Sequence, residues 1–121
     1  MLNTAKALQE FWSSFQLPAY TTETVPDDQD VPYITYSLSE TEPLEPLTHF
    51  AKVYYRSTSN ADLLAKVDEI LAVFRQNGDT VRLECEGGYV VLRNPTVQLM
   101  TDQDPVFRFA YVSTTINCFH M

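Results

Sequence analysis

The sequence predicts an α+β fold, in which two helices pack against a mainly antiparallel sheet of about five to six strands. Two segments carry apolar residues at helical spacing, and the remaining regular segments alternate as strands do. The predicted strands follow one another in groups, an order typical of antiparallel sheets. The 121 residues, 45% of them apolar, are expected to form a single domain over 1–121.

The first predicted helix covers residues 3–16. Leu8, Trp12 and Phe15 recur at helical spacing, so this segment is expected to bury an aromatic stripe. The helix is expected to end before Pro18, because the residue that precedes a proline is pushed out of the helical conformation. The aromatic stripe must then pack against another element of the fold.

The second predicted helix covers residues 60–77 and has the clearest pattern in the sequence. Ser59 or Asn60 is expected to cap its start, and Gly78 follows its end, where a left-handed residue commonly stops a helix. Its apolar stripe comprises Leu63, Val67, Ile70, Leu71 and Phe74, with Leu64 beside it.

The strands before this helix are expected at 33–38 and 48–56, joined as an antiparallel hairpin by the acidic loop 39–47. The preceding segment 18–32 holds three prolines and four acids, which indicates an extended connection without regular structure. In the second strand the alternation predicts two faces, one with Phe50, Lys52 and Tyr54 and the other with Ala51, Val53 and Tyr55.

After the second helix the sequence predicts four more strands, at 80–85, 88–93, 96–100 and 106–119. A Gly-Gly pair at 87–88 marks a tight turn between the first two. The last strand carries apolar residues on both faces, so it is expected at the centre of the sheet or at an edge covered by another subunit. Its two faces hold Phe107, Phe109 and Tyr111, and Ala110, Val112 and Ile116.

The charge of the chain is negative and unevenly distributed. Sixteen acids and eight bases give a net charge of −8, and residues 1–50 hold eight acids with Lys6 as their only base. The bases are scattered singly, whereas surfaces that bind nucleic acid cluster Lys and Arg. We therefore expect no tight binding of nucleic acid or of an anionic membrane. No apolar run approaches the ~18 residues of a membrane span, and no charged-then-apolar N-terminus is present, so we also expect no membrane span and no secretion signal.

The sequence shows no motif for catalysis or for a cofactor. His49, Cys85, Cys118 and His120 would form a four-ligand metal set if their strands were neighbours, but the usual close-spaced ligand pairs are missing. We expect no enzyme activity, no metal and no cofactor, with both cysteines as reduced core residues, while a Cys85–Cys118 disulfide stays open. A surface role is expected for His49 before a catalytic one.

Two further features concern the surface. Many tyrosines fall on predicted strands, and tyrosine is common at protein interfaces, although ordinary sheet packing explains any single one as well. Leu44 and Leu47 lie in an acidic loop, where they either fold back over the sheet or contact a neighbour. Asp27, Asp28 and Asp30 resemble part of a calcium-binding loop. The sequence around them lacks the glycine and the bidentate glutamate of such a loop, so a solvated loop is the preferred interpretation.

Several short motifs, taken in order, resemble small proteins encoded in the tail-assembly region of long-tailed phages and prophages of Gram-positive bacteria. These motifs are structural rather than chemical, and they extend over most of the chain. They are Phe11–Phe15, Leu17–Tyr20, Val25–Asp27, Pro32–Tyr36, Tyr55–Ser57 and Gly87–Gly88. Such proteins are similar to tail terminator, or tail-completion, proteins, a family of minor tail proteins.

The resemblance implies a fold, a function and a set of partners. The family's fold is a sheet flanked by helices, and its members form rings, typically hexameric, that cap the finished tail tube and present the surface to which the filled head attaches. The implied partners are further copies of the chain, the tail tube protein, and a head–tail connector or head-closure protein. The implied location is the virion tail, assembled in the host cytoplasm, and the family has no catalytic residues.

The acidic loops are the candidate contact regions of such a ring subunit. The candidate interface residues are Asp27, Asp28, Asp30, Glu42, Leu44, Glu45 and Leu47. Because an acidic lining repels DNA, part of the acid excess is expected to face the ring channel or a basic tube surface. Two functions of other classes stay open: a small-ligand binder or enzyme with a cavity between sheet and second helix, and an acidic regulatory module that binds a host protein.

Overall fold

The computed structural model describes residues 4–38, 45–101 and 103–120. Its elements follow in the order α1(Thr4–Ser13), β1(Ala19–Thr21), β2(Tyr33–Tyr36), β3(Leu47–Arg56), α2(Ala61–Arg75), β4(Thr80–Cys85), β5(Gly88–Thr101) and β6(Phe107–His120). The six strands form one sheet in the order β1-β2-β3-β6-β5-β4, in which β1 and β2 are parallel and all other neighbours antiparallel. The predicted α+β class, with two helices on a mainly antiparallel sheet, is confirmed.

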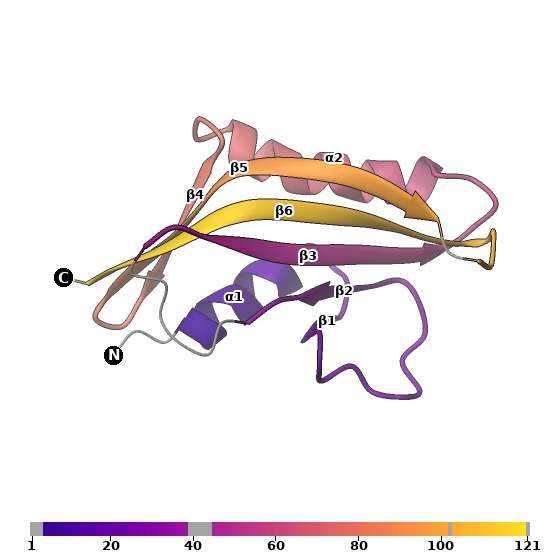
Figure 1. Ribbon diagram of the computed structural model, residues 1–121, viewed down its shortest axis with the longest axis horizontal. Coiled ribbons are helices and arrows are strands. Elements are labelled where there is room, and N and C mark those ends of the chain that lie inside the picture. Colours follow the sequence, from indigo (N-terminus) through magenta and orange to yellow (C-terminus); the bar gives the residue numbers. More distant parts are fainter. Residues whose placement is uncertain (1–3, 39–44, 102, 121) are drawn as a thin grey trace.

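Both helices lie on the same side of the sheet, behind the strands in Figure 1. α2 packs across β3, β6, β5 and β4, while α1 contacts β1 and β4, the two margins of the curled sheet. The other side of the sheet has no helix over it in the described part of the chain. Neither described helix is long and apolar enough to cross a membrane.

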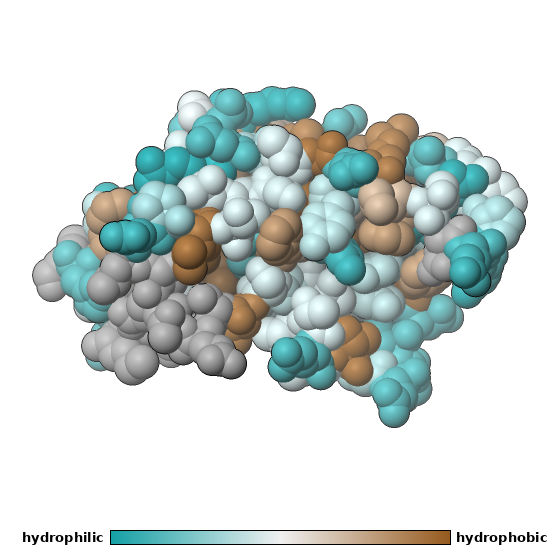
Figure 2. Space-filling model, viewed as in Figure 1, coloured by the Kyte–Doolittle hydropathy of each residue, from teal (hydrophilic) through white to brown (hydrophobic). Residues whose placement is uncertain are grey.

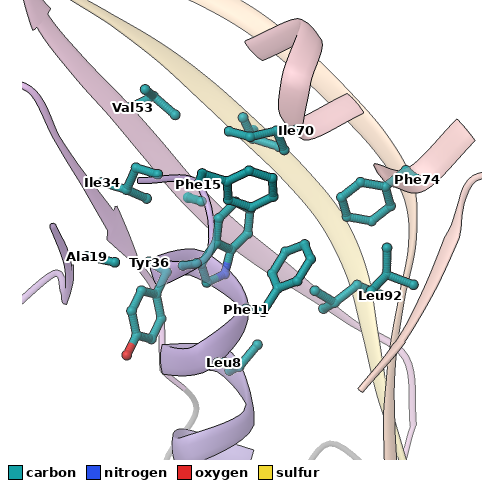
Figure 3. Packing of buried hydrophobic residues seen from close by; sticks show 14 of the residues in the cluster. Leu8, Phe11, Phe15, Ala19, Ile34, Tyr36, Val53, Ile70, Phe74 and Leu92 are labelled. Atoms are coloured by element: carbon teal, nitrogen blue, oxygen red, sulfur yellow. The ribbon is translucent and has the colours of Figure 1, made fainter. Parts of the chain in front are cut away.

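The hydrophobic core fills the space between the helices and the sheet (Figure 3). Trp12 and Phe74 are fully buried, and the ring of Phe11 meets both edge-on, with centroids 4.9 Å from Trp12 and 6.0 Å from Phe74. The predicted stripe of α2 is confirmed for its four buried members, Leu63, Val67, Ile70 and Phe74. Leu71 is half-buried, and Leu64 faces solvent.

The two ends of α2 use the predicted residues in different ways. Gly78 has the expected left-handed conformation, with φ of 66°. At the start, the Ser59 hydroxyl accepts a hydrogen bond from the backbone N–H of Ala61 at 3.0 Å. Asn60 makes no capping bond, because its side-chain oxygen accepts instead from the guanidinium of Arg108 at 3.0 Å. Arg108 thereby ties the start of α2 to β6.

Two strand predictions are corrected by the structure. The segment expected to lack regular structure contains β1, which pairs with β2 so that Ala19 lies opposite Ile34. Three residues are too few for an alternating pattern to show. The strands predicted at 88–93 and 96–100 are one strand, β5, because the turn expected at Asn94 is a bulge with φ of 56°, after which pairing with β6 resumes.

The last strand, β6, lies between β3 and β5, so of the two positions expected for it the central one is found. Ala110, Val112 and Ile116 are buried on the helix side. Cross-strand partners share a face, so the register with β3 places the other set of β6 side chains beside Lys52 and Tyr54, on the side without helices. The predicted division of both strands into two faces is confirmed.

Candidate functional site

The side of the sheet opposite the helices is a surface rich in aromatic residues. Figure 2 views this side and shows pale and brown residues across its middle, with teal, hydrophilic residues around much of the rim. Phe119 near the end of β6 and Tyr89 beside it on β5 stack on this side with ring centroids 5.0 Å apart. Register and alternation place a larger aromatic set on β1, β2, β3 and the segment Phe107–Tyr111 of β6. We call this set the aromatic ladder; it comprises Tyr20, Tyr33, Phe50, Tyr54, Phe107, Phe109 and Tyr111.

The rings of the aromatic ladder contact one another from strand to strand. Tyr33 on β2 stacks on Tyr54 on β3 with centroids 4.8 Å apart, and Tyr54 lies 5.5 Å from Phe109 on β6. Further along the same strands, Phe50 meets Tyr111 edge-on at 5.2 Å. Phe50 is 38% exposed, so part of this apolar strip is open to solvent. Aromatic strips of this kind are typical of surfaces that contact other proteins.

Two cations of β3 lie against the aromatic ladder. The Lys52 ammonium is 5.7 Å from the ring centroid of Phe109 and 5.2 Å from that of Tyr111. The Arg56 guanidinium is 5.9 Å from the ring of Phe107. Such cation–π contacts hold positive charge on an apolar surface, where it is available to a negatively charged partner.

The sheet is basic although the protein is acidic. Its six strands hold five of the eight bases of the chain and one of the sixteen acids, Glu84. The five bases are Lys52, Arg56, Arg82, Arg93 and Arg108. The excess of acid therefore lies in the loops and helices, and the charges of the two regions are opposite in sign.

The predicted interface residues Asp27, Asp28 and Asp30 lie together in the loop that joins β1 to β2. All three are exposed, and none forms an ion pair within the described residues. The loop is held at the margin of the sheet by Tyr20, whose hydroxyl donates a hydrogen bond to the side-chain oxygen of Gln29. It therefore presents three exposed carboxylates beside one end of the aromatic ladder, of which that of Asp30 also accepts a hydrogen bond from the backbone N–H of Val31 at 2.8 Å.

Glu45 and Leu47, the other predicted interface residues that the structure describes, do not join this group. Glu45 lies just before β3 and Leu47 begins it; both are exposed, Leu47 by 46%. The loop between β1 and β2 ends where β2 begins, at Tyr33. Tyr33 lies opposite Tyr54, seven residues further along β3 than Leu47 and so roughly 23 Å from it. Glu42 and Leu44 lie outside the described residues. The candidate residues that the structure describes thus form two separate regions of surface.

The candidate metal ligands are not brought together. Within the ranges that the structure describes, no group of three or more histidines, cysteines or acids has the arrangement of a metal site. Cys85 and Cys118 are both present as thiols. His49 does not have the surface position expected of it, because the register of β3 points it toward the core, where it is 3% exposed.

His49 instead forms a buried polar contact with α1. Its Nε2 atom accepts a hydrogen bond from the indole N–H of Trp12 at 3.1 Å, and its Nδ1 atom is 3.3 Å from the hydroxyl of Ser37. Burial lowers the pKa of His49 from 6.5 to about 4, so the ring is neutral at physiological pH. Since Nε2 accepts, the proton of the neutral ring belongs on Nδ1. The geometry is that of a structural contact.

A small hollow lies between α1 and the β4–β5 hairpin. Its volume is about 150 Å³, and it is lined by Lys6, Ala7, Glu10, Glu84, Cys85 and Glu86. Pockets for small molecules usually enclose ~300–1,000 Å³. The space between the sheet and α2, where a ligand cavity was considered, is filled by Val67, Ile70 and Phe74, each at most 3% exposed.

No protein-family model matches the chain, and a search of curated proteins finds no significant match. What the protein does must therefore be inferred from its own surfaces and from the motifs described above.

The aromatic ladder was not predicted as a surface. The alternation in β3 and β6 assigns its residues to one face, yet both faces of each strand carry apolar side chains, so the face that meets the helices cannot be chosen from the pattern. A usable signal is the charge of the predicted strands. The stretch 47–56 contains two bases and no acid in the half of the chain that is otherwise acidic.

Proposed function

We propose that the protein is a non-enzymatic structural protein of a phage tail, a tail terminator or completion subunit that caps the tail tube and forms the head-attachment surface by ring assembly. The observation that carries this proposal is the sheet face that no described helix covers, with its seven-residue aromatic ladder. Large apolar surfaces on small proteins commonly mark contacts with other proteins. The resemblance to tail-completion proteins supplies the class of partner.

The outer edge of β5 supports an assembly role. β4 pairs with Gly88–Arg93 only, so the segment Thr96–Thr101 pairs with β6 on one side and has no strand on the other in the described residues. Leu99 and Met100, within this segment, are 42% and 36% exposed. An unpaired edge with exposed apolar residues is a ready site for strand addition or for cover by a neighbouring subunit.

The proposal is tested by deleting the gene from the phage or prophage that carries it. We expect filled heads and tails that fail to join, and an infectious titre at background, because the tube would lack its cap. A plasmid copy of the wild-type gene should restore the titre. A normal titre and normal particles after the deletion would contradict the proposal and favour a ligand-binding or regulatory role.

A further inference from the structure

The loop between β1 and β2, called the acidic loop from here on, and the aromatic ladder are complementary in charge. The loop between β1 and β2 carries four exposed acids and no base: Glu23, Asp27, Asp28 and Asp30. None of the four is in an ion pair within the described ranges. The ladder carries Lys52 and Arg56 on apolar rings, and the strands that form it contain no acid.

We infer that the aromatic ladder of one copy of this chain binds the acidic loop of the next copy. This inference rests on the proposed function, since it names the contact by which ring subunits would associate. The loop lies at the β1 margin and the ladder spans β1 to β6, so the two surfaces differ. A contact made in one direction only, from the loop of each copy to the ladder of the next, is heterologous. Heterologous contacts repeat from copy to copy and close into rings when the rotation permits.

The ladder suits an acidic protein segment better than it suits nucleic acid. Arg56 is already 3.2 Å from the carboxylate of Asp104, which leaves Lys52 as the cation of the ladder without an acidic neighbour among the described residues. Binding of single-stranded nucleic acid requires a groove of several cations alongside the stacking rings.

The contact is tested by charge reversal on each surface separately. The ladder variant is Lys52→Glu with Arg56→Glu, and the loop variant is Asp27→Lys with Asp28→Lys and Asp30→Lys. Sedimentation equilibrium of the full chain in about 20 mM NaCl should show self-association of the wild type below about 1 mM protein, weakened at least about tenfold in about 500 mM NaCl. Each variant alone should associate at least about tenfold more weakly than the wild type.

An equimolar mixture of the two variants should recover association to the wild-type level. In the mixture, the reversed loop of one variant meets the reversed ladder of the other, and the unaltered surfaces also meet, so unlike copies alternate. Recovery in the mixture also shows that both variants are folded. The matched controls reverse the same numbers of charges elsewhere, Lys6→Glu with Arg75→Glu and Glu10→Lys with Asp68→Lys and Glu86→Lys, and should associate as the wild type does.

Three results would overturn the inference. These are a wild type that stays monomeric at about 1 mM in low salt, variants that associate as the wild type does, and a mixture that does not recover. Binding of an oligothymidylate of about 20 nucleotides, lost in the ladder variant, would assign the surface to nucleic acid instead. Any of these can occur while the gene deletion still abolishes infectious particles, so failure of this contact is distinguishable from failure of the proposed function.

Discussion

Trp12 and His49 show how one buried polar pair links a helix to the sheet. The indole N–H of Trp12 would lose its hydrogen-bond partner in the core if the imidazole did not accept from it at 3.1 Å. An unsatisfied buried donor costs about 1–3 kcal/mol. The pair therefore fixes the position of α1 on β3, and it requires a neutral ring.

This pair makes stability depend on pH. The unfolded chain protonates His49 near pH 6.5, and the folded chain near pH 4, so the unfolded state binds more protons between these values. The stability that the neutral His49 contributes should be fully present above pH 6.5, and the free energy of unfolding should fall as the pH drops toward 4. The His49 contribution to this fall is roughly 2 kcal/mol between pH 7 and pH 4.5.

Urea unfolding at these two pH values measures the fall. In His49→Gln the fall in the free energy of unfolding should be smaller by most of the His49 contribution. In His120→Gln, which replaces an exposed histidine, the fall should be as large as in the wild type. Equal falls in the wild type and His49→Gln would show that the buried ring does not take part.

The helices and strands were predictable to different degrees. The stripe of α2 is confirmed because its residues lie 3 or 4 positions apart over a long segment, a pattern that a strand cannot produce. β1 was missed, because Ala19–Thr21 owe their strand conformation to pairing with β2 and not to their own pattern. β5 was divided in two, because Asn-Pro is a turn signal that here forms a bulge.

The end of α2 allows a test at the level of one element. Gly78 has a φ of 66°, and a Cβ added there would meet no atom within 4 Å, so Gly78→Ala should destabilise through backbone strain alone. The expected loss in the free energy of unfolding is about 1–2 kcal/mol. Gly78→Asn should lose less, because asparagine tolerates the left-handed conformation better. Equal losses for both, measured by urea unfolding, would show that φ is not the cause.

The separation of charge between a basic sheet and acidic loops and helices becomes visible only in the folded molecule. The sequence shows that acids prevail before residue 50, and the expectation of acidic contact loops follows from that. It does not show that the strands, far apart along the chain, collect five of the eight bases in one sheet. Asp27, Asp28 and Asp30 were thus predictable as one contact region, whereas the aromatic ladder that complements them required the register of β2, β3 and β6.

The whole molecule accordingly has two surfaces of opposite character on one small fold. The acidic loop lies at the β1 margin, and the aromatic ladder lies on the side of the sheet that the helices leave uncovered (Figures 1 and 2). A molecule with two complementary surfaces can repeat its contacts with further copies, and this is what a ring subunit requires.

As a tail terminator, the protein is proposed to be part of the virion, at the end of the tail nearest the head. Immunogold electron microscopy of purified particles from the strain that carries the gene tests it most directly. The proposed function predicts label at the junction of head and tail, and no label on particles from the deletion strain. Label spread along the tail, or purified particles without the protein, would contradict it.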